Sequence, residues 1–203
     1  MNDLVLATKN PKKVEEIRAL LADVPVRILS LLDFPDIPDT PETGTTFAEN
    51  AEIKARAASK TTGKIALADD SGLEVDALCG EPGVYSNRFA EPGASDRDKY
   101  MRILELLEGV PDEKRTARFK AAIAVAAPDG EVKIIEGTCE GRIAREPRGI
   151  NGFGYDPIFY LPELGKMMAE LTSEEKNTIS HRGRAFRSAK NLLVQVLGDT
   201  AMG

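Results

Sequence analysis

The octapeptide Ile65-Ala66-Leu67-Ala68-Asp69-Asp70-Ser71-Gly72 is the part of the sequence that most directly indicates the fold. Its first four residues form a short apolar run, which is typical of a strand buried inside a sheet. Its last four residues are two carboxylates, a hydroxyl and a glycine, which favour a turn out of the sheet. Because open α/β sheets bind ligands beyond the carboxyl ends of their strands, residues 69–72 are expected at a functional edge.

The adjacent carboxylates Asp69 and Asp70 are the candidates for chemistry in this stretch. Two neighbouring acids repel each other, and each raises the pKa of the other unless a cation lies between them. A divalent metal ion removes that cost, whereas a plain Asp-Ser-Gly turn explains the same residues without a metal. Consecutive side chains of a strand point to opposite faces. One carboxylate is therefore expected to be the main metal ligand, and the turn is expected to change the direction of both side chains.

Strands and helices alternate on both sides of this stretch. Upstream, the pattern predicts strands at residues 4–7 and 26–29, a helix from about Pro11 that Pro25 ends, and a proline-rich loop over residues 33–44. A capping box at residues 46–49 starts a helix that runs to about Thr62, before Gly63. Downstream, the pattern predicts a helix over about residues 96–107, strands at residues 115–127, 132–136 and 157–161, and a final helix over about residues 180–197. This mixture predicts an α/β protein.

The composition fits one globular domain over residues 1–203, or two intimately joined lobes. Hydrophobic residues make up 42% of the chain and charged residues 30%. No apolar run approaches the ~20 residues that a membrane helix needs. The N-terminus reaches polar residues by Thr8, too soon for a secretory signal, so we expect a cytoplasmic protein. Residues 200–203 are expected to form a flexible tail.

The charged residues, histidine and cysteines exclude several kinds of site. The net charge of −6 argues against a nucleic-acid groove as the main surface, although a local cluster of Lys and Arg can still bind a small anion. Cys79 and Cys139 give neither a disulfide framework nor metal-site spacing. His181 is the single histidine, so a multi-histidine zinc site is excluded. Oxygen atoms would have to hold any metal, which favours Mg²⁺ or Mn²⁺.

A lysine-rich segment follows the first predicted strand and leads into a helix. It consists of Thr8, Lys9, Asn10, Pro11, Lys12 and Lys13. Backbone N–H groups at a helix start, a hydroxyl, an amide and ammonium groups together suit a polyphosphate. A solvated, capped helix start explains the same residues, and the segment lacks the Walker pattern of a P-loop.

The helix expected after residue 46 could contribute to the same site. Glu42, in the loop before it, and Glu49, in its first turn, could add oxygens to a metal site. Lys54 lies four residues after Asn50, so the two share a helix face, and Lys54 could meet a phosphate there. A lone lysine on a helix is more often simply solvated.

A glycine-rich segment, residues 149–157, contains two aromatic residues. Glycines permit a close backbone approach, and an aromatic ring held in such a loop could stack on a base. A tight turn with its aromatic residues in the core explains the segment equally well. Lys176 and residues 180–183 lie at a predicted helix boundary, where a lone histidine is more often structural than catalytic.

Taken in order, these segments resemble one known family. The chain carries Thr8-x-Asn10-x-x-Lys13, Glu42-Thr43-Gly44-x-Thr46-Phe47-x-Glu49-Asn50, Ala68-Asp69-Asp70-Ser71-Gly72, Pro82-Gly83-Val84-Tyr85-Ser86, Gly152-Phe153-Gly154-Tyr155-Asp156-Pro157 and Ser180-His181-Arg182-Gly183. Over nearly its whole length the chain resembles the inosine triphosphate pyrophosphatase family. The resemblance implies an elongated mixed sheet flanked by helices, two lobes with the active-site cleft between them, and a homodimer. It also implies cleavage of ITP, dITP and XTP to the monophosphate and pyrophosphate.

The resemblance also implies roles for individual residues. It implies phosphate contacts at Thr8, Lys9, Asn10, Pro11, Lys12, Lys13 and Lys54. It implies a metal site of Glu42 and Asp70, with Asp70 also the catalytic proton acceptor and Asp69 its neighbour. The rest of the implied substrate-binding set is Ser71, Phe153, Gly154, Tyr155, Asp156, Lys176, His181 and Arg182.

A mechanism follows as a hypothesis. Mg²⁺ held by Asp70 and Glu42 is expected to neutralise phosphate charge and to lower the pKa of a bound water that attacks the α-phosphorus. Asp70 could accept that water's proton, while lysine ammonium groups stabilise the departing pyrophosphate. Lysine and arginine donate hydrogen bonds but do not accept them. Lys176 and Arg182 beside the base would therefore favour a 6-keto oxygen over a 6-amino group.

Two other functions stay open on the sequence. One is a pyrophosphatase for a different nucleotide, such as a modified pyrimidine or a standard triphosphate. The other is a non-catalytic nucleotide-binding or sensor module that uses the same lysine-rich segment. The two adjacent acids favour catalysis, because binding alone would gain from fewer acids near phosphates. Nucleic-acid binding fits poorly with the net charge of −6 and 5% aromatic residues.

Overall fold

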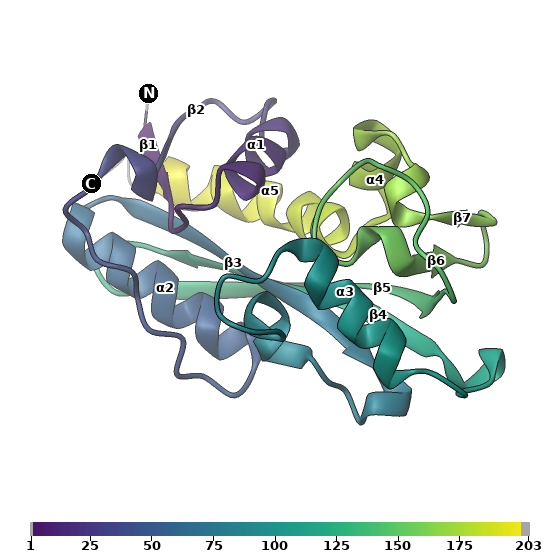
Figure 1. Ribbon diagram of the computed structural model, residues 1–203. Coiled ribbons are helices and arrows are strands. Elements are labelled where there is room, and N and C mark those ends of the chain that lie inside the picture. The colour runs from purple at the N-terminus through teal and green to yellow at the C-terminus, as the bar shows by residue number, and fades with distance from the viewer. Residues whose placement is uncertain (1, 200–203) are drawn as a thin grey trace. The chain divides into compact units, whose positions relative to one another are not determined.

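The computed structural model describes residues 2–199 and has an α/β fold (Figure 1). Among these residues the strands form one seven-stranded mixed sheet in the order β2-β1-β3-β4-β5-β6-β7. Strand β1 pairs in parallel with β2 and β3, whereas β6 pairs antiparallel with β5 and β7. The strands are β1 (Asn2–Leu6), β2 (Val26–Ser30), β3 (Ile65–Val75), β4 (Thr116–Ala126), β5 (Val132–Ile143), β6 (Phe159–Leu161) and β7 (Lys166–Met167).

Clear sequence signals mark the start of several of the α-helices in the described chain. The α-helices are α1 (Pro11–Leu20), α2 (Phe47–Thr62), α3 (Asp96–Leu106), α4 (Ser173–Ile179) and α5 (His181–Asp199). Capping boxes start α2, α3 and α4. Gly63 ends α2 with φ at +65°, the left-handed conformation that glycine adopts without strain. None of the helices within residues 2–199 is long and apolar enough to cross a membrane.

The described chain divides into two compact units, and each is built from separate stretches of sequence. The first takes in residues 2–70, 121–137 and 184–199, and the second takes in residues 71–120 and 138–183. Strands β3, β4 and β5 contribute residues to both units.

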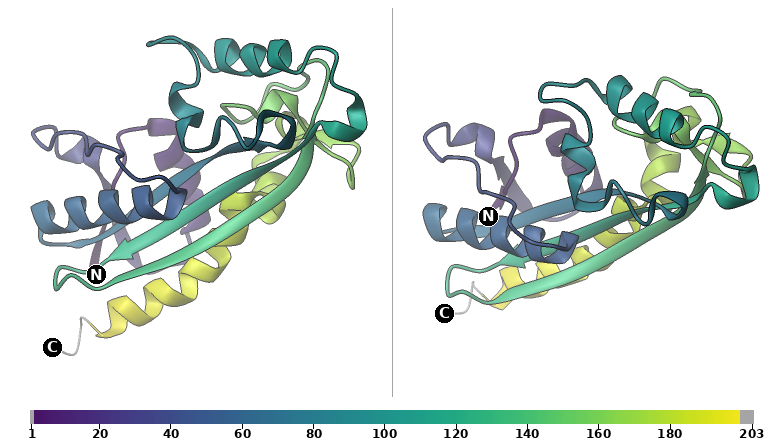
Figure 2. Two further views of the ribbon diagram at one scale, coloured as in Figure 1. Left: turned by 90° about the horizontal axis from the view of Figure 1, so that it is seen from below. Right: turned by 60° about the horizontal axis from the view of Figure 1, so that its bottom comes forward.

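In the first unit, helices cover both faces of the strands. Leu4 and Leu6 of β1 share one apolar cluster with residues of α1 and α5, including Ile17 and Phe186. Helix α2 covers the opposite face, with Ala55 fully buried (Figure 1). The two further views again show α2 and α5 on opposite faces of these strands (Figure 2). Because both faces are covered, the buried parts of these strands contain runs of apolar residues, such as Leu4, Val5 and Leu6 in β1, as expected for a buried sheet.

The second unit has an apolar core of its own. Leu73 of β3, Ile103 of α3 and Phe119 of β4 share a cluster with Tyr155 and Phe159. All of them are buried. The residues around 153–159 are therefore held by a packed core rather than by loop contacts alone.

The sequence-based prediction of elements is confirmed in class and order, with three differences. Strand β3 does not turn after Ala68 but continues through Asp69, Asp70, Ser71 and Gly72 to Val75. Strand β5 extends well beyond residue 136, and β6 begins at Phe159 after one turn of 3-10 helix. The short elements β7 and α4 were not predicted. Residues 200–203, expected as a tail, lie outside the described residues.

Candidate functional site

Asp69 and Asp70 lie inside β3, close to the carboxyl end of β1. The parallel pairing sets Leu6, the last residue of β1, opposite Leu67, so the acids follow shortly after this point. Only 6% of Asp69 and 3% of Asp70 is exposed. Because neighbouring side chains of a strand point to opposite faces, the two acids reach different partners.

Each buried acid is paired with its own lysine. In the first pair, the Nζ atom of Lys13, on α1, lies 2.9 Å from Oδ2 of Asp69 and also donates to the Asp69 carbonyl oxygen at 3.3 Å. In the second pair, the Nζ atom of Lys54, on α2, lies 2.5 Å from Oδ1 of Asp70. Ion pairing of this kind lets charged groups remain inside a covered strand. The cations that accompany the two acids in the structure are thus lysines from two helices.

Glu42 brings a second carboxylate to the same ammonium group. Its Oε1 atom lies 3.0 Å from Nζ of Lys54. The Lys54 ammonium therefore contacts one carboxylate from the loop before α2 and another from β3. Two carboxylates that meet a common cation are the kind of oxygen donors that Mg²⁺ and Mn²⁺ prefer. The residues fit the divalent ion expected from the sequence.

Burial and charge together set the protonation of this cluster. Burial raises the pKa of Asp70 above its usual value, and the ammonium groups of Lys54 and Lys13 offset only part of that effect. Burial opposes the charge of Lys54, but attraction to Asp70 and Glu42 outweighs it and raises the pKa of Lys54. Lys54 is therefore a cation at neutral pH. A carboxylate with a raised pKa is a better proton acceptor than an ordinary aspartate.

The lysine-rich segment lies at the start of α1, and its groups have distinct partners. Asn10 caps the helix, because its Oδ1 atom accepts the backbone N–H groups of Lys12 at 3.0 Å and Lys13 at 3.4 Å. The Thr8 hydroxyl accepts the Asn10 N–H group at 3.1 Å. The Lys9 ammonium donates to the Ile37 carbonyl oxygen at 2.8 Å. Pro11 and Lys12 are exposed. Of the three lysines, Lys13 is the one that reaches the buried acids.

The second unit brings together most of the other predicted substrate residues. Asp156 is buried, and its Oδ2 atom accepts from Nζ of Lys176 at 2.7 Å and from the Phe153 N–H group at 2.9 Å. The ammonium of Lys176 lies 4.9 Å from the centre of the Phe153 ring, and the guanidinium carbon of Arg182 lies 5.5 Å from it. Arg182 also donates to the Ser71 hydroxyl at 2.7 Å. The half-buried Phe153 ring is thus bordered by two cations.

Two predicted residues of this set have structural partners. The Tyr155 ring lies in the apolar core, and its hydroxyl donates to the Ser86 carbonyl oxygen at 2.7 Å. Burial raises the pKa of Tyr155, so it stays protonated and remains a donor. His181 is buried and stacks on Phe119, with the ring centres 4.8 Å apart. Both side chains hold their surroundings in place.

Some contacts of this set were missed by the sequence analysis. Oδ2 of Asp96, at the start of α3, accepts the Gly154 N–H group at 2.9 Å. Phe119 supports His181 from β4. The alternating pattern of residues 115–127 predicts that Phe119 faces inward. No local signal indicates that Phe119 meets a residue 62 positions later, or that Asp96 meets Gly154.

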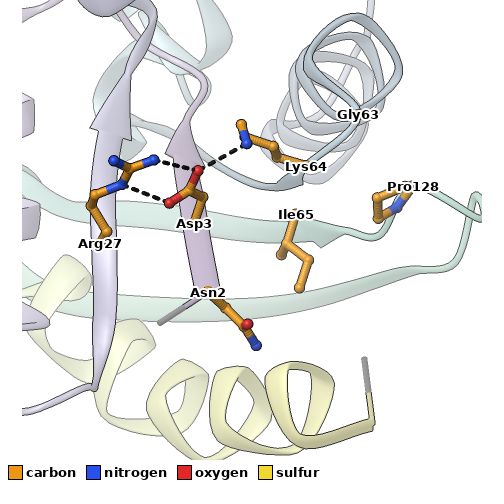
Figure 3. A pocket seen from close by; sticks show the side chains of 7 residues that line it. All are labelled: Asn2, Asp3, Arg27, Gly63, Lys64, Ile65 and Pro128. Atoms are coloured by element: carbon orange, nitrogen blue, oxygen red, sulfur yellow. Dashed lines mark hydrogen bonds and ion pairs between the residues drawn. The ribbon is translucent and has the colours of Figure 1, made fainter. Parts of the chain in front are cut away.

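A separate hollow lies at the amino-terminal ends of β1, β2 and β3 (Figure 3). It is lined by Asn2, Asp3, Arg27, Gly63, Lys64, Ile65 and Pro128. Arg27 donates to both oxygens of Asp3 at 2.7 and 2.8 Å, and Nζ of Lys64 lies 2.8 Å from Oδ2 of Asp3. The two cations hold the pKa of Asp3 well below its usual range, Arg27 having the larger effect. These seven residues include none of those predicted to bind substrate or metal.

Comparison with known proteins adds independent information on the whole chain. A family model described as the Ham1 family matches residues 4–192. The chain is 54% identical over 198 residues to the dITP/XTP pyrophosphatase of Geobacillus kaustophilus, covering 98% of this chain and 97% of that protein.

Solved structures agree with this likeness. A HAM1 protein from Coxiella burnetii superposes with a TM-score of 0.88 at 47% identity, covering 96% of this chain and all of that chain. The Ham1 protein of Staphylococcus aureus gives a TM-score of 0.85 at 42% identity, covering 96% of this chain and 99% of that chain. Fold and sequence are therefore similar to these proteins from end to end.

Proposed function

The chain belongs to the Ham1 family, and we propose that it hydrolyses ITP, dITP and XTP to the nucleoside monophosphate and pyrophosphate. It is an enzyme that acts on phosphoric anhydrides, like its relatives named dITP/XTP pyrophosphatase. The observation that carries the proposal is the cluster of Asp70, Glu42 and Lys54, in which two carboxylates share one ammonium group. Removing aberrant purines from the nucleotide pool would be the result of this reaction.

The metal in this proposal is Mg²⁺, with Mn²⁺ as an alternative, and Asp70 and Glu42 are the residues that would hold it. When bound, such an ion would supply charge neutralisation at the phosphates and would make a nearby water more acidic. The two carboxylates fit that task, because both already contact one cation. Lys54 would then be free to turn its ammonium toward the phosphate chain.

Asp70 is our candidate for the group that accepts the proton of the water attacking the α-phosphorus. Its burial, which raises its pKa, supports this role because an ideal base has a pKa close to the working pH. The ammonium groups of Lys13 and Lys54 lie beside the two acids, where each can stabilise negative charge that develops on the departing pyrophosphate. We also assign Thr8, Lys9, Asn10, Pro11 and Lys12 to contacts with the phosphate chain.

For the base, we propose the set of the second unit. Phe153 offers a ring face, and the two cations beside it, Lys176 and Arg182, can only donate hydrogen bonds. Donors of this kind favour the 6-keto oxygen of hypoxanthine or xanthine over the 6-amino group of adenine. A wrong edge leaves buried polar groups unpaired, at a cost of roughly 1–3 kcal/mol each. Ser71, Gly154, Asp156 and His181 would hold this arrangement in place, with Tyr155 supporting it from the core.

One experiment separates this function from its rivals. Purified protein is incubated with ITP, XTP, GTP and ATP, with and without Mg²⁺, and pyrophosphate release is measured. Metal-dependent release from ITP and XTP well above that from ATP is expected. Faster release from ATP would indicate a pyrophosphatase for standard nucleotides, and binding without release would indicate a sensor module.

The role of Asp70 is tested by one substitution. Asp70→Asn keeps the shape of the side chain but removes its ability to accept a proton. Turnover of ITP should fall by about 10²- to 10⁴-fold, the usual contribution of a general base. Near-normal turnover in this variant would exclude Asp70 as the proton acceptor.

The homodimer and the cytoplasmic location implied by the sequence stay predictions. Light scattering coupled to gel filtration would test the first, with a mass of about 44 kDa expected for two copies of the 22.0 kDa chain. A mass near that of a single chain would argue against a dimer.

A further inference from the structure

The loop that carries Glu42 is attached to the first turn of α2 through backbone groups. The N–H group of Gly44 donates to Oδ1 of Asn50 at 2.8 Å. The N–H groups of Thr45 and Thr46 donate to Oε2 of Glu49, at 2.6 and 3.3 Å. Three consecutive N–H groups therefore bind side chains of α2, starting two residues after Glu42.

Of these anchors, the contact with Asn50 is the buried one. Asn50 is 0% exposed, whereas Glu49 is at the surface. The approach is so close that Gly44 has no room for a side chain, since an added Cβ would lie 2.7 Å from Cβ of Glu49 and 2.8 Å from Oδ1 of Asn50. The glycine at this position is explained by that proximity.

The nitrogen end of the Asn50 carboxamide lowers the stability of the fold. Its Nδ2 atom is buried and has no hydrogen-bond partner among the described residues. A buried donor without an acceptor costs about 1–3 kcal/mol. An apolar residue would pack at this position without that cost, so packing alone gives no reason for an amide here. The hydrogen bond to Gly44 gives one.

Asn50 also lies one helical turn before Lys54, a member of the cluster of Asp70, Glu42 and Lys54. Lys54 follows it by four residues, one turn along the same face of α2. Lys54 contacts Glu42 at 3.0 Å, so this ion pair adds to the backbone contacts that join the loop to α2. Loss of the contact with Asn50 would remove the buried anchor of the loop that carries Glu42.

We infer that Asn50 is a positioning residue for Glu42: its carboxamide oxygen fixes the loop at Gly44, so that the Glu42 carboxylate meets the same cation as Asp70. This inference rests on the proposed metal site of Glu42 and Asp70. Asn50 acts through the loop. Partners that orient the residues of a metal site typically contribute about 10- to 100-fold in metal affinity.

The first test measures metal binding directly, by the loss of the free Mn²⁺ signal in electron paramagnetic resonance. Asn50→Ala removes the acceptor, and Gly44→Ala pushes the loop away while Asn50 stays. Each should weaken Mn²⁺ binding by at least about 10-fold. Asn50→Asp keeps an acceptor for the Gly44 N–H group and should bind much more tightly than Asn50→Ala. Glu52→Gln, which changes an exposed ion pair with Arg56 on the same helix, is the matched control.

The second test asks whether Asn50 acts through Glu42. If it does, the double variant Asn50→Ala/Glu42→Gln should bind Mn²⁺ as Glu42→Gln does, within about twofold, the scatter of independent sites. If the loss of Mn²⁺ affinity in the double variant equals the product of the two single losses, the inference is overturned, because Asn50 then affects the site by another route. Equal weakening in Asn50→Asp and Asn50→Ala would overturn it as well.

Failure of the inference is distinguishable from failure of the proposed function. If the unchanged protein binds Mn²⁺ and releases pyrophosphate from ITP while Asn50→Ala and Gly44→Ala bind Mn²⁺ equally well, the inference alone is wrong. If the unchanged protein neither binds Mn²⁺ nor cleaves ITP, the proposed function is wrong and the inference falls with it.

Discussion

Asp156 forms a buried ion pair beside the ring that we propose for base contact. Its carboxylate is buried and accepts hydrogen bonds from both Lys176 and the N–H group of Phe153. Lys176 is itself only 7% exposed. A buried ion pair is a weak source of net stability, but removal of one partner leaves an uncompensated charge inside the protein.

Asp156→Asn should therefore destabilise the protein. The amide can still accept the Phe153 N–H group but no longer neutralises Lys176, which predicts a loss of about 3–5 kcal/mol in the free energy of unfolding. Urea unfolding measures it. The double variant Asp156→Asn/Lys176→Met, which removes both charges, should recover part of the loss. Equal stability of Asp156→Asn and the unchanged protein would show that the pair is not a buried charge pair.

Gly152 lies so close to Asp156 that a side chain at this position would collide with the carboxylate. A Cβ added to Gly152 would lie 2.0 Å from Oδ2 of Asp156, and its φ of +74° also favours glycine. Gly152→Ala should displace the carboxylate from Lys176. A lost hydrogen bond to a charged group costs about 1.5–3 kcal/mol, so kcat/KM for ITP should fall by roughly 10- to 100-fold.

Gly165→Ala is the matched control for that prediction. Gly165 also has a positive φ, +65°, but an added Cβ meets nothing within 4 Å. It lies in the turn between β6 and β7, outside the proposed substrate-binding set. Backbone strain is thus common to both variants, and only Gly152→Ala adds the clash. A similar loss of kcat/KM in the two variants would mean that the clash with Asp156 is unimportant.

At the scale of elements, α2 carries Lys54, and its first turn holds the loop that bears Glu42. Its N-cap Thr46 accepts the N–H group of Glu49 at 3.1 Å. Thr46→Ala should lower the free energy of unfolding by about 1 kcal/mol, the usual value of such a cap. Thr61→Ala, at an exposed position in the last turn of the same helix, should be neutral or slightly stabilising, since alanine is the better helix former. Equal urea midpoints for the two variants would contradict the capping role.

The same helix shows what the sequence could predict. Its capping box, its alanine-rich body and Gly63 are local signals, and all of them agree with the observed helix from Phe47 to Thr62. Helix α4 was not predicted, because its 7 residues are too few for a clear apolar period.

Strand β3 shows where such local reasoning fails. Adjacent carboxylates followed by Ser71 and Gly72 are typical of a turn, and that prediction was wrong because the strand continues. Each acid in the continuing strand has a lysine partner, and these lysines lie 56 and 16 residues away in the sequence. No local pattern contains that information. The motifs of the family, by contrast, indicated residues that prove to cluster within each unit, such as Phe153 with Lys176 and Arg182.

At the scale of the whole molecule, overall charge and local charge act in opposite directions on a triphosphate. The chain has 33 acidic and 27 basic residues, so the average field repels an anion. The proposed contacts with the phosphate chain instead rely on lysines held by buried acids, as Lys13 and Lys54 are. Binding should therefore depend on the divalent ion, because without it the carboxylates of Asp70 and Glu42 oppose the phosphates.

This dependence predicts how ligands stabilise the protein. An α,β-imido analogue of ITP cannot be cleaved at the proposed bond, so it reports binding alone. At about 100 times its dissociation constant, a ligand that binds only the folded chain adds roughly 2.7 kcal/mol. For a chain of this size, each kcal/mol raises the Tm by about 2–4 °C, which predicts a shift of roughly 5–11 °C with analogue and Mg²⁺ together. Scanning calorimetry measures it.

The matching controls follow from the charges and from the base. The analogue without Mg²⁺ should raise the Tm much less, since Asp70 and Glu42 then repel the phosphates at close range. The α,β-imido analogue of ATP with Mg²⁺ should also have a smaller effect, because its 6-amino group offers donors where Lys176 and Arg182 require an acceptor. Equal Tm shifts with and without Mg²⁺ would show that the metal does not contribute to nucleotide binding. Equal shifts for the two bases would mean that the cations beside Phe153 do not select the base.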